Sequence, residues 1–318
     1  MFDKRNYFYH VYKEHSFSKA AEKLYISQPS LSAIITREEK KIGSPVFDRS
    51  TNPVSLTPIG EKYISCCEQI FRIEDDFHNF LHSTEELVTG NLCIGSSHVF
   101  ISTILPEIIS EFGKAYPSVH LEVVDLDSDD LKKELLNGTL DLIIDNNRLE
   151  KNISEIYPLG SECLLLALPK HHQINEQLKK ERLTFDDIEN NLHLSSHIPA
   201  IDLSRLKDIP FVTMQKGYDT RARMDQILKD ASVTPHIIFE MNQLAGIFSI
   251  ISSGIGASVI SDTLIKKSPF TSVQLYYYKI NHPSALRPVF IQKKKNRYLT
   301  PPMNEFIRIA KSCHTLTL

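Results

Sequence analysis

The sequence has 318 residues, of which 42% are hydrophobic and 24% are charged, and its formal net charge is −3. This length and balance exclude a fibrous chain, a disordered chain and a single small domain. The apolar run at 247–260 is interrupted by serines and glycines, and the first ten residues lack a signal-peptide core, so we expect a cytosolic protein with no membrane partner.

The first 60 residues differ from the rest in charge. They hold nine basic and six acidic side chains, a surplus of three positive charges, which leaves a surplus of six negative charges for the remainder. A basic head on an acidic body is typical of a protein whose head alone meets a polyanion.

The head predicts two short helices before its central element. Apolar residues at helical spacing indicate a helix over 4–15. A second helix follows, with Ser18 as its expected N-cap, and it buries Ala20 and Ala21 where helices cross steeply. Residues 25–27 then form a three-residue turn of the length that a helix-turn-helix uses.

A third helix is expected over residues 28–41. Ser27 caps it, Pro29 is tolerated in its first turn, and Gly43 ends it. Its apolar stripe is Leu31, Ile34, Ile35 and Ile42. Its outer face carries Gln28, Ser32, Thr36 and Arg37, the kind of polar groups that a recognition helix presents to base edges.

Two short strands, 46–49 and 54–56, flank a turn-rich tip at 50–53. Two amphipathic helices alone are common in proteins, but three helices followed by a wing predict a winged helix-turn-helix.

Residues 16–60, SFSKAAEKLYISQPSLSAIITREEKKIGSPVFDRSTNPVSLTPIG, resemble the signature of the LysR-type transcriptional regulators nearly position by position. The chain departs from that pattern at Ala33, where arginine is usual, and at Glu38, where leucine is usual. The resemblance implies binding to a double-stranded operator with inverted-repeat half-sites. The expected DNA-binding residues are Ser18, Ser27, Gln28, Pro29, Ser32, Thr36, Arg37, Arg49 and Asn52.

Thr57 and Pro58 start a long linker helix, which we place over residues 58–89 after a head of residues 1–57. Its apolar heptad positions, interrupted by Thr84, are Ile59, Tyr63, Cys66, Ile70, Ile73, Phe77, Phe80 and Leu87. Such a helix is on the order of 45 Å long, too long to bury its seam in the head, so we expect it to pair with a second chain. The alternative is that it lies on its own C-terminal domain. In the LysR family the equivalent helix dimerises, and dimers pair into tetramers.

From residue 90 onward strands alternate with helices, which predicts a mostly parallel α/β sheet. The phrases ILPEIISEFGKAYPSVHLEV, LLNGTLDLII and IISSGIGASVI resemble the LysR effector-binding domain. That resemblance implies a two-lobed, periplasmic-binding-protein-like (type 2) fold for residues 90–318. We place lobe I at about 90–161 and 268–318 and lobe II at about 162–267, with crossovers near Ser161 and Lys267.

Ligands of open α/β folds bind at the carboxyl ends of strands, against helix N-termini. The polar residues at such places are Ser96, Ser97, Ser128, Thr220, Arg221 and Asn242. Helix capping explains each of them equally well, and the resemblance carries a cleft role best to Ser96, Ser97 and Thr220. We expect a small polar or anionic effector between the lobes, with Arg221 placed to offset a carboxylate.

The sequence offers no catalytic, cofactor or metal motif. It lacks HExxH, CxxC, GxSxG, GxxxxGKS and GxGxxG patterns, and its five cysteines are an odd number best read as reduced thiols. We therefore expect no enzyme and no metal. Two other functions remain open: an effector-independent DNA-binding regulator whose C-terminal domain only oligomerises, and a solute-binding protein, which would have no use for a winged helix.

Overall fold

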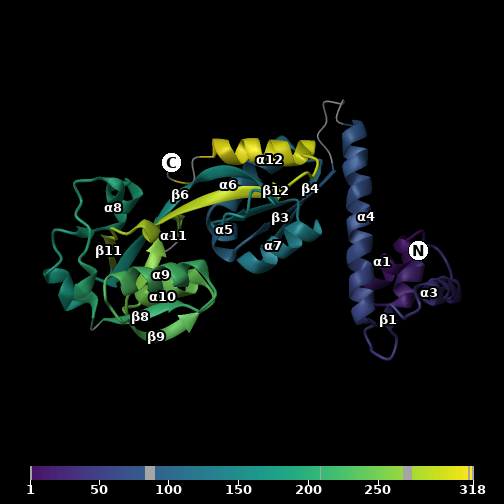
Figure 1. Cartoon of the computed structure of the whole chain (residues 1–318), viewed down its shortest axis with the longest axis horizontal. Helices are drawn as coiled ribbons and strands as arrows, with labels where there is room; N and C mark the ends of the chain where they lie inside the picture. Colours follow the sequence, from purple (N-terminus) through teal and green to yellow (C-terminus); the bar gives the residue numbers. More distant parts are fainter. Residues whose placement is uncertain (1, 83–89, 208, 268–273, 314–315, 317–318) are drawn as a thin grey trace. The chain divides into compact units, whose positions relative to one another are not determined.

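The structure is a computed structural model that describes residues 2–82, 90–207, 209–267, 274–313 and 316. It divides into two compact units, Met1–Thr84 and Glu85–Leu318, and the first unit includes the linker helix (Figure 1). No helix in the described ranges combines the length and the apolar character that a membrane span requires.

The first unit is a winged helix-turn-helix followed by one long helix, as predicted. Its elements are α1 (Arg5–Glu14), α2 (Phe17–Lys23), α3 (Gln28–Ile42), β1 (Phe47–Asp48), β2 (Ser55–Leu56) and α4 (Pro58–His82). The two strands pair antiparallel and form the wing. Ala20 and Ala21 are buried in one cluster with Phe8, Leu31 and Ile35, because small side chains let the three helices approach one another.

Of the helix ends expected from the sequence, both ends of α3 are confirmed and the N-cap of α2 is not. Ser27 caps α3 by accepting the backbone N–H of Ser30 at 3.3 Å, and Gly43 ends this helix with a left-handed φ of 87°, as predicted. The expectation that Ser18 caps α2 is wrong. The helix begins at Phe17, and Ser16 accepts the N–H of Lys19 at 3.4 Å.

A buried carboxylate joins α3 to the wing. Oε1 of Glu39 accepts the backbone N–H groups of Val46 at 2.8 Å and Phe47 at 3.2 Å, and Oε2 accepts from Arg49 Nη2 at 2.9 Å. The neighbouring Glu38 is also buried, and the Nζ of Lys41 lies 2.6 Å from it. An ion pair with a surface lysine therefore accommodates the charge that departs from the family pattern.

Helix α4 uses part of its predicted seam inside its own unit. Tyr63 is buried, and its ring lies 5.0 Å from that of Phe2 and 4.7 Å from that of Phe8. The prediction that Tyr63 faces a partner chain is wrong, because the first turns of α4 close the core of the winged helix.

The remaining seam positions lie on the outside of that core. Ile59, Ile73 and Phe77 are 46%, 67% and 60% exposed, while Cys66 and Ile70 are partly buried. The side chain of Phe80, together with Thr84 and Leu87, lies outside the described residues.

The second unit alternates strands and helices, as expected. Its strands are β3 (Gly90–Ser96), β4 (Val119–Asp125), β5 (Leu142–Asp145), β6 (Ser154–Pro169), β7 (Arg182–Leu183), β8 (Pro210–Met214), β9 (His236–Met241), β10 (Ser258–Ser261), β11 (Leu275–Lys279) and β12 (Leu286–Lys294). Its α-helices are α5 (His98–Thr103), α6 (Leu105–Ala115), α7 (Ser128–Asn137), α8 (Phe185–Glu189), α9 (Asp219–Asp230), α10 (Leu244–Ser252), α11 (Asp262–Lys267) and α12 (Pro301–Ser312).

One long strand, β6, runs through both lobes. The main sheet has the order β4-β3-β5-β12-β6-β11-β7, with β10 also paired to β6, and β8 pairs with β9 in a separate parallel sheet. The expectation of a mostly parallel sheet is wrong for the main sheet. Strand β3 pairs parallel with β4 and β5, but β6 pairs antiparallel with β10, β11 and β12, because the chain crosses between the lobes and returns. The first part of β6 pairs with β12 in lobe I, and residues 164–169 pair with β10 and β11 in lobe II. The crossover expected near Ser161 thus falls within β6.

The return crossover expected near Lys267 is wrong. Strand β11 follows that point but still belongs to lobe II, because Tyr277 pairs with Leu183 of β7 and with Ala167 of β6. The chain returns to lobe I after β11, since β12 begins by pairing Leu286 with Cys163. Apolar clusters fill each lobe separately: Leu92, Ile94 and Phe112 belong to the core of lobe I, and Phe211 and Tyr278 to that of lobe II.

Candidate functional site

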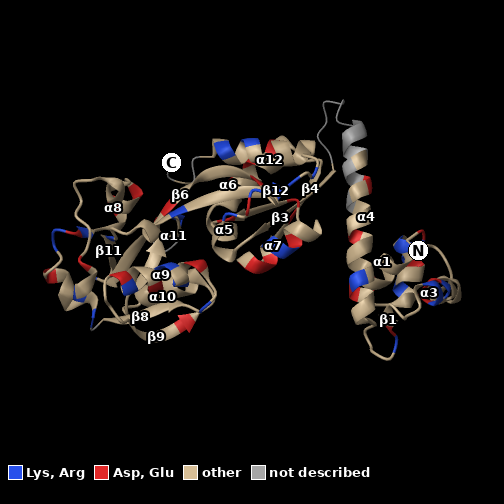
Figure 2. Ribbon diagram, in the orientation of Figure 1, with Lys and Arg blue, Asp and Glu red and all other residues tan. Residues whose placement is uncertain are grey.

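The outer face of α3 is polar and hollowed. The side chains that line this hollow are Gln28, Pro29, Ser32, Ala33, Thr36, Arg37 and Lys40. It holds five of the nine predicted DNA-binding residues on one surface, and Lys40 is an additional basic side chain that the sequence reading left out. The ribbon of α3 in Figure 2 includes blue Lys and Arg positions, in agreement with the positive surplus of the head.

Arg49 of the wing reaches across to the recognition helix. It donates hydrogen bonds to Ser32 Oγ at 3.3 Å and Thr36 Oγ1 at 3.1 Å, and its guanidinium lies 4.9 Å from the ring centre of Phe17. Because each hydroxyl accepts from Arg49, its own O–H is directed to other acceptors. This network fixes two of the hydroxyls that the sequence assigned to DNA.

The other predicted DNA-binding residues lie around this face. Ser27 is occupied as the cap of α3, Ser18 is exposed in the first turn of α2, and Asn52 is exposed in the wing between β1 and β2. Tyr25, which the sequence reading assigned only to the turn, is 95% exposed between α2 and α3, with a φ of 54°.

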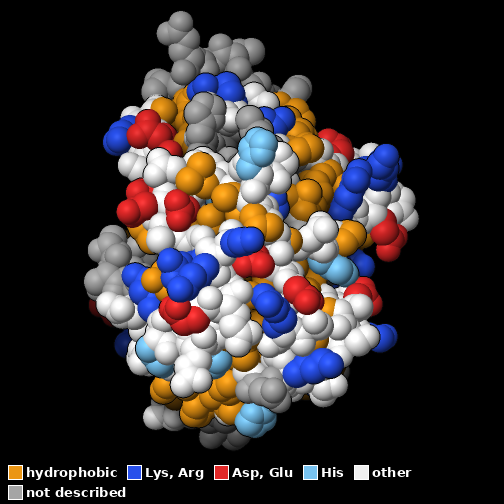
Figure 3. Space-filling model, turned by 90° about the vertical axis from the view of Figure 1, so that its left-hand side faces the viewer, with side chains coloured by type: hydrophobic (Ala, Val, Ile, Leu, Met, Phe, Trp, Pro, Cys, Tyr) orange, Lys and Arg blue, Asp and Glu red, His pale blue; other side chains and the backbone are white. Residues whose placement is uncertain are grey.

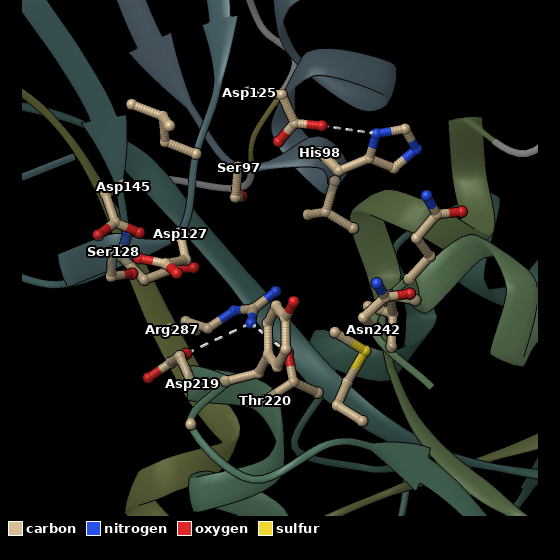
Figure 4. A pocket seen from close by; sticks show the side chains of 18 residues that line it. Ser97, His98, Asp125, Asp127, Ser128, Asp145, Asp219, Thr220, Asn242 and Arg287 are labelled. Atoms are coloured by element: carbon tan, nitrogen blue, oxygen red, sulfur yellow. Dashed lines mark hydrogen bonds and ion pairs between the residues drawn. The ribbon is translucent and has the colours of Figure 1, made fainter. Parts of the chain in front are cut away.

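The second unit contains a cavity of about 260 Å³ between its lobes. Lobe I contributes the ends of β3, β4 and β5 with the starts of α5 and α7, and lobe II contributes the starts of α9 and α10 (Figure 4). Of the predicted effector residues, Ser97, Ser128, Thr220 and Asn242 line it. These are the carboxyl ends of strands and the N-termini of helices that the fold predicted.

The structure does not bring Ser96 and Arg221 to the cavity, so their predicted roles are corrected. Ser96 is fully buried, and its hydroxyl donates to the carbonyl of Ile144 at 2.8 Å, because neighbouring strand residues face opposite sides. Arg221 is buried and donates to the Met214 carbonyl at 2.9 Å and to Asp225 and Glu240. Successive helix residues point about 100° apart, which separates Arg221 from Thr220.

The cation that does line the cavity is Arg287 of β12, which the sequence reading missed. It is buried, donates to Glu162 Oε1 at 2.7 Å through Nε, and donates to Thr220 Oγ1 at 2.8 Å through Nη1. Its Nη1 also lies 3.3 Å from Asp219. Burial disfavours the charge of Arg287, but Glu162 and Asp219 outweigh that effect and raise its pKa. The signal in the sequence is one arginine next to the apolar residues 288–291, and it does not reveal a partner 125 residues away.

Four carboxylates also line the cavity: Asp125, Asp127, Asp145 and Asp219. Asp125 lies 3.1 Å from the ring of His98, and Asp127 caps α7 by accepting the N–H groups of Asp129 and Asp130. Asp145 is only 4% exposed. Burial raises its pKa, against the hydrogen bonds from Ser128 and the Asn146 N–H, and the nearby charge of Asp219 raises it further.

One group of side chains within the described ranges has the spacing of metal ligands: Cys163, His193 and Asp262, whose donor atoms all lie within 4.8 Å of one another. Asp262 already accepts the N–H groups of Cys163 at 2.8 Å and Thr263 at 2.9 Å, and lies 2.9 Å from the ring of His193. Burial raises the pKa of the Cys163 thiol to about 11. These contacts explain the group as a buried link between β6 and α11.

Two family models match the chain. The model described as "Bacterial regulatory helix-turn-helix protein, lysR family" matches residues 2–61, and that described as "LysR substrate binding domain" matches residues 85–313. Among curated proteins of Bacillus subtilis (strain 168), the uncharacterized HTH-type transcriptional regulator YcgK is 26% identical over 95% of this chain and 91% of its own length. The HTH-type transcriptional regulator AlsR is 27% identical over 98% and 95%.

Solved structures share the fold along the whole chain. Full-length CbnR complexed with its target DNA has a TM-score of 0.68 at 16% identity, covering 98% of this chain and 99% of that one. A full-length OxyR variant from Pseudomonas aeruginosa has a TM-score of 0.70 at 20% identity, covering 98% and 94%.

The buried pair at the lobe junction leads to a stability prediction. Arg287→Met leaves Glu162 buried without its cation and should lower the free energy of unfolding of the second unit by about 3–5 kcal/mol. Adding Glu162→Gln to that variant should recover most of the loss, because the uncompensated charge is gone. Urea denaturation of the full-length protein measures the free energy of unfolding of the single and the double variant. Hydrogen exchange of the backbone amides in β6 and β12 measures the local effect of each change.

Arg223→Met is the matched control. Its pair with Asp219 is partly exposed, so the variant should lose less than about 1 kcal/mol. Equal losses for Arg223→Met and Arg287→Met would contradict a special role for the buried pair.

Proposed function

Because this chain belongs to the LysR family of bacterial transcriptional regulators, we propose that it binds operator DNA as a homodimer or homotetramer and that a small polar effector, held between its lobes, modulates that binding. The observation that carries the proposal is the combination, in one chain, of an exposed polar recognition helix and a polar cavity lined by two lobes.

The DNA-binding part is supported by the chemistry of α3. Its N-terminal residues, Gln28 and Ser32, offer an amide and a hydroxyl, the groups that hydrogen-bond base edges in the major groove. Arg37 and Lys40 supply positive charge for phosphates one turn further on. The face of lobe II in Figure 3 differs, since acidic and basic side chains are interspersed on its described part. The fold that this chain shares with CbnR in complex with its target DNA agrees with a DNA-binding head.

The recognition helix generates a prediction about specificity. Gln28→Ala should cost roughly 1–3 kcal/mol of discrimination at one base-pair position, because its bidentate amide contact is lost. Selection of binding sites from a random DNA library, at fixed salt, measures the preference at each position. Arg37→Ala is the control: it should weaken binding to all sequences alike. An unchanged base preference for Gln28→Ala would exclude Gln28 from the residues that contact base edges.

Dimerisation is supported by the apolar side chains of α4. Ile73 and Phe77 lie one turn apart and are 67% and 60% exposed, and an isolated helix gains little from exposing such residues. A second α4 would cover them. A two-fold dimer presents two recognition helices, which matches inverted-repeat half-sites.

Charges on that apolar stripe should separate the subunits. Ile73→Asp combined with Phe77→Asp should convert the dimer to monomers, since paired helices would have to bury four carboxylates. Sedimentation velocity at micromolar concentration measures the state, and Lys62→Asp, an exposed change on the same helix, should leave it unaltered. A wild-type protein that sediments as a monomer would contradict this part of the proposal.

The sensing part is supported by the position of the cavity. A ligand shifts an equilibrium only through different affinities for its states, and contacts to both lobes provide that difference when their separation changes. Ser97 belongs to lobe I and Asn242 to lobe II, and both line the cavity.

Filling the cavity should therefore abolish sensing. Ser97→Phe and Asn242→Phe each place a ring in the cavity and should remove the inducer response of a reporter gene, while operator binding stays within about twofold of wild type. Ser249→Phe, on an exposed position of α10 that does not line the cavity, is the control. A wild-type dose response in both cavity variants would contradict a sensing role for this cavity. The absence of any inducer response in the wild-type protein would favour the second candidate function, an effector-independent regulator.

A further inference from the structure

The charges that line the cavity are unequal. Asp125, Asp127, Asp145 and Asp219 face it with four carboxylates, whereas Arg287 is the single Lys or Arg among the described lining residues. His98 also lines the cavity, and its ring already lies against Asp125. An anionic effector would therefore enter a site of predominantly negative potential.

The positive charge of Arg287 is already compensated by carboxylates of the protein. Its guanidinium is buried against Glu162, which is itself fully buried, and it also pairs with Asp219 and hydrogen-bonds Thr220. Asp219 has a second partner in Arg223, 2.8 Å away. These pairs at the lobe junction are thus close to neutral, whereas Asp125, Asp127 and Asp145 give the lobe I wall an excess of negative charge.

Asp145 is the most informative of the lobe I carboxylates. It is almost fully buried, it lines the cavity, and it accepts hydrogen bonds from Ser128 and from the N–H groups of Asn146 and Asn147. Among the described residues no Lys, Arg or His forms an ion pair with it. A buried carboxylate without a cation is unfavourable in a low-dielectric site, as its raised pKa reflects, and a bound cation would relieve that penalty.

The arrangement suits an extended cation more than a metal ion. Figure 4 shows Asp127, Ser128 and Asp145 together on one side of the cavity, with Asp219 and Arg287 next to them from across the lobe junction. Within the described ranges, the one group with metal-ligand spacing lies elsewhere, around Cys163. Part of the remaining cavity wall is apolar and could hold a short aliphatic chain; the side chains of this part are Val99, Leu126, Met214 and Leu244.

We propose that the effector carries a protonated amine on a short aliphatic chain, and that Asp145 and Ser128 hold its ammonium group at the lobe I wall of the cavity. This inference rests on the proposed function for the cavity but specifies the charge of its ligand. The sequence suggested a small polar or anionic effector, and the inference rejects the anionic alternative. The amine could belong to a diamine or to an amino acid, and both share the ammonium group that the site recognises.

Three four-carbon probes of different charge test the proposal on the full-length protein: putrescine, 4-aminobutyrate and succinate. Isothermal titration should detect putrescine, 4-aminobutyrate or both, and succinate should not bind. Binding of putrescine alone identifies a diamine as the source, and binding of 4-aminobutyrate alone identifies an amino acid. Succinate binding more tightly than both amines, or no amine binding up to about 10 mM, would overturn the inference.

Variants connect the binding to this wall. Asp145→Asn keeps the shape but removes the charge, and should weaken amine binding about tenfold or more, the effect of losing a charged hydrogen bond. Ser97→Phe should abolish binding by filling the cavity. Glu122→Gln, which removes an exposed carboxylate of β4 outside the cavity, should bind like wild type.

The variants also separate this inference from the proposed function. Amine binding that Asp145→Asn changes by less than about twofold would exclude Asp145 from the site and overturn the inference. Amine binding that depends on Asp145 but leaves operator affinity unaltered would support the inference and contradict effector modulation. Succinate binding that Ser97→Phe abolishes would contradict the inference of an amine ligand but agree with the proposed function, because the cavity would still be the effector site.

Discussion

The ion pair between Arg287 and Glu162 lies at the point where the two lobes of the second unit meet. The two residues are opposite each other in the pairing of β12 with β6, and both are buried. Removing two charges from water is unfavourable, so this pair depends on the register of the two strands. A slip of β12 by one residue would turn Arg287 to the other face and leave Glu162 buried without its partner. Through Thr220 the same arginine also fixes the start of α9.

The buried pairing of Arg287 affects which ligands the cavity can bind. An arginine at the end of a cleft looks like an anion-binding group, but its charge is balanced inside the protein before a ligand arrives. Recognition then depends on the groups that are not balanced, and these are the carboxylates of lobe I. The chemistry of the site is therefore determined by which charges have partners, and the presence of an arginine alone does not decide it.

The head also contains a buried carboxylate that pairs with an arginine. Glu39 is a buried carboxylate whose partners are two backbone N–H groups and Arg49. These hydrogen bonds of a charged side chain join α3 to the start of the wing. Arg49 in turn holds Ser32 and Thr36 in place. We propose that these hydroxyls face DNA, and their fixed positions would reduce the conformational entropy that is lost on DNA binding.

The sequence by itself determined the features that depend on neighbours within a few residues. Ser27 and Gly43 bound the recognition helix, and the wing follows from its turn residues, because capping and turn hydrogen bonds span three or four positions. The alternation of strands and helices likewise follows from local hydrophobic periodicity.

Only the tertiary structure decided which side chains face the functional surfaces. Tyr63 fits a heptad seam but packs in the head, since the periodicity shows that a face is apolar and not what covers it. Ser96 and Ser97 are adjacent and polar, yet the pleat buries one and points the other into the cavity. The Arg287–Glu162 pair joins residues 125 positions apart, and the register of β12 on β6 creates it. Such contacts depend on long-range pairing, which has no local pattern in the sequence.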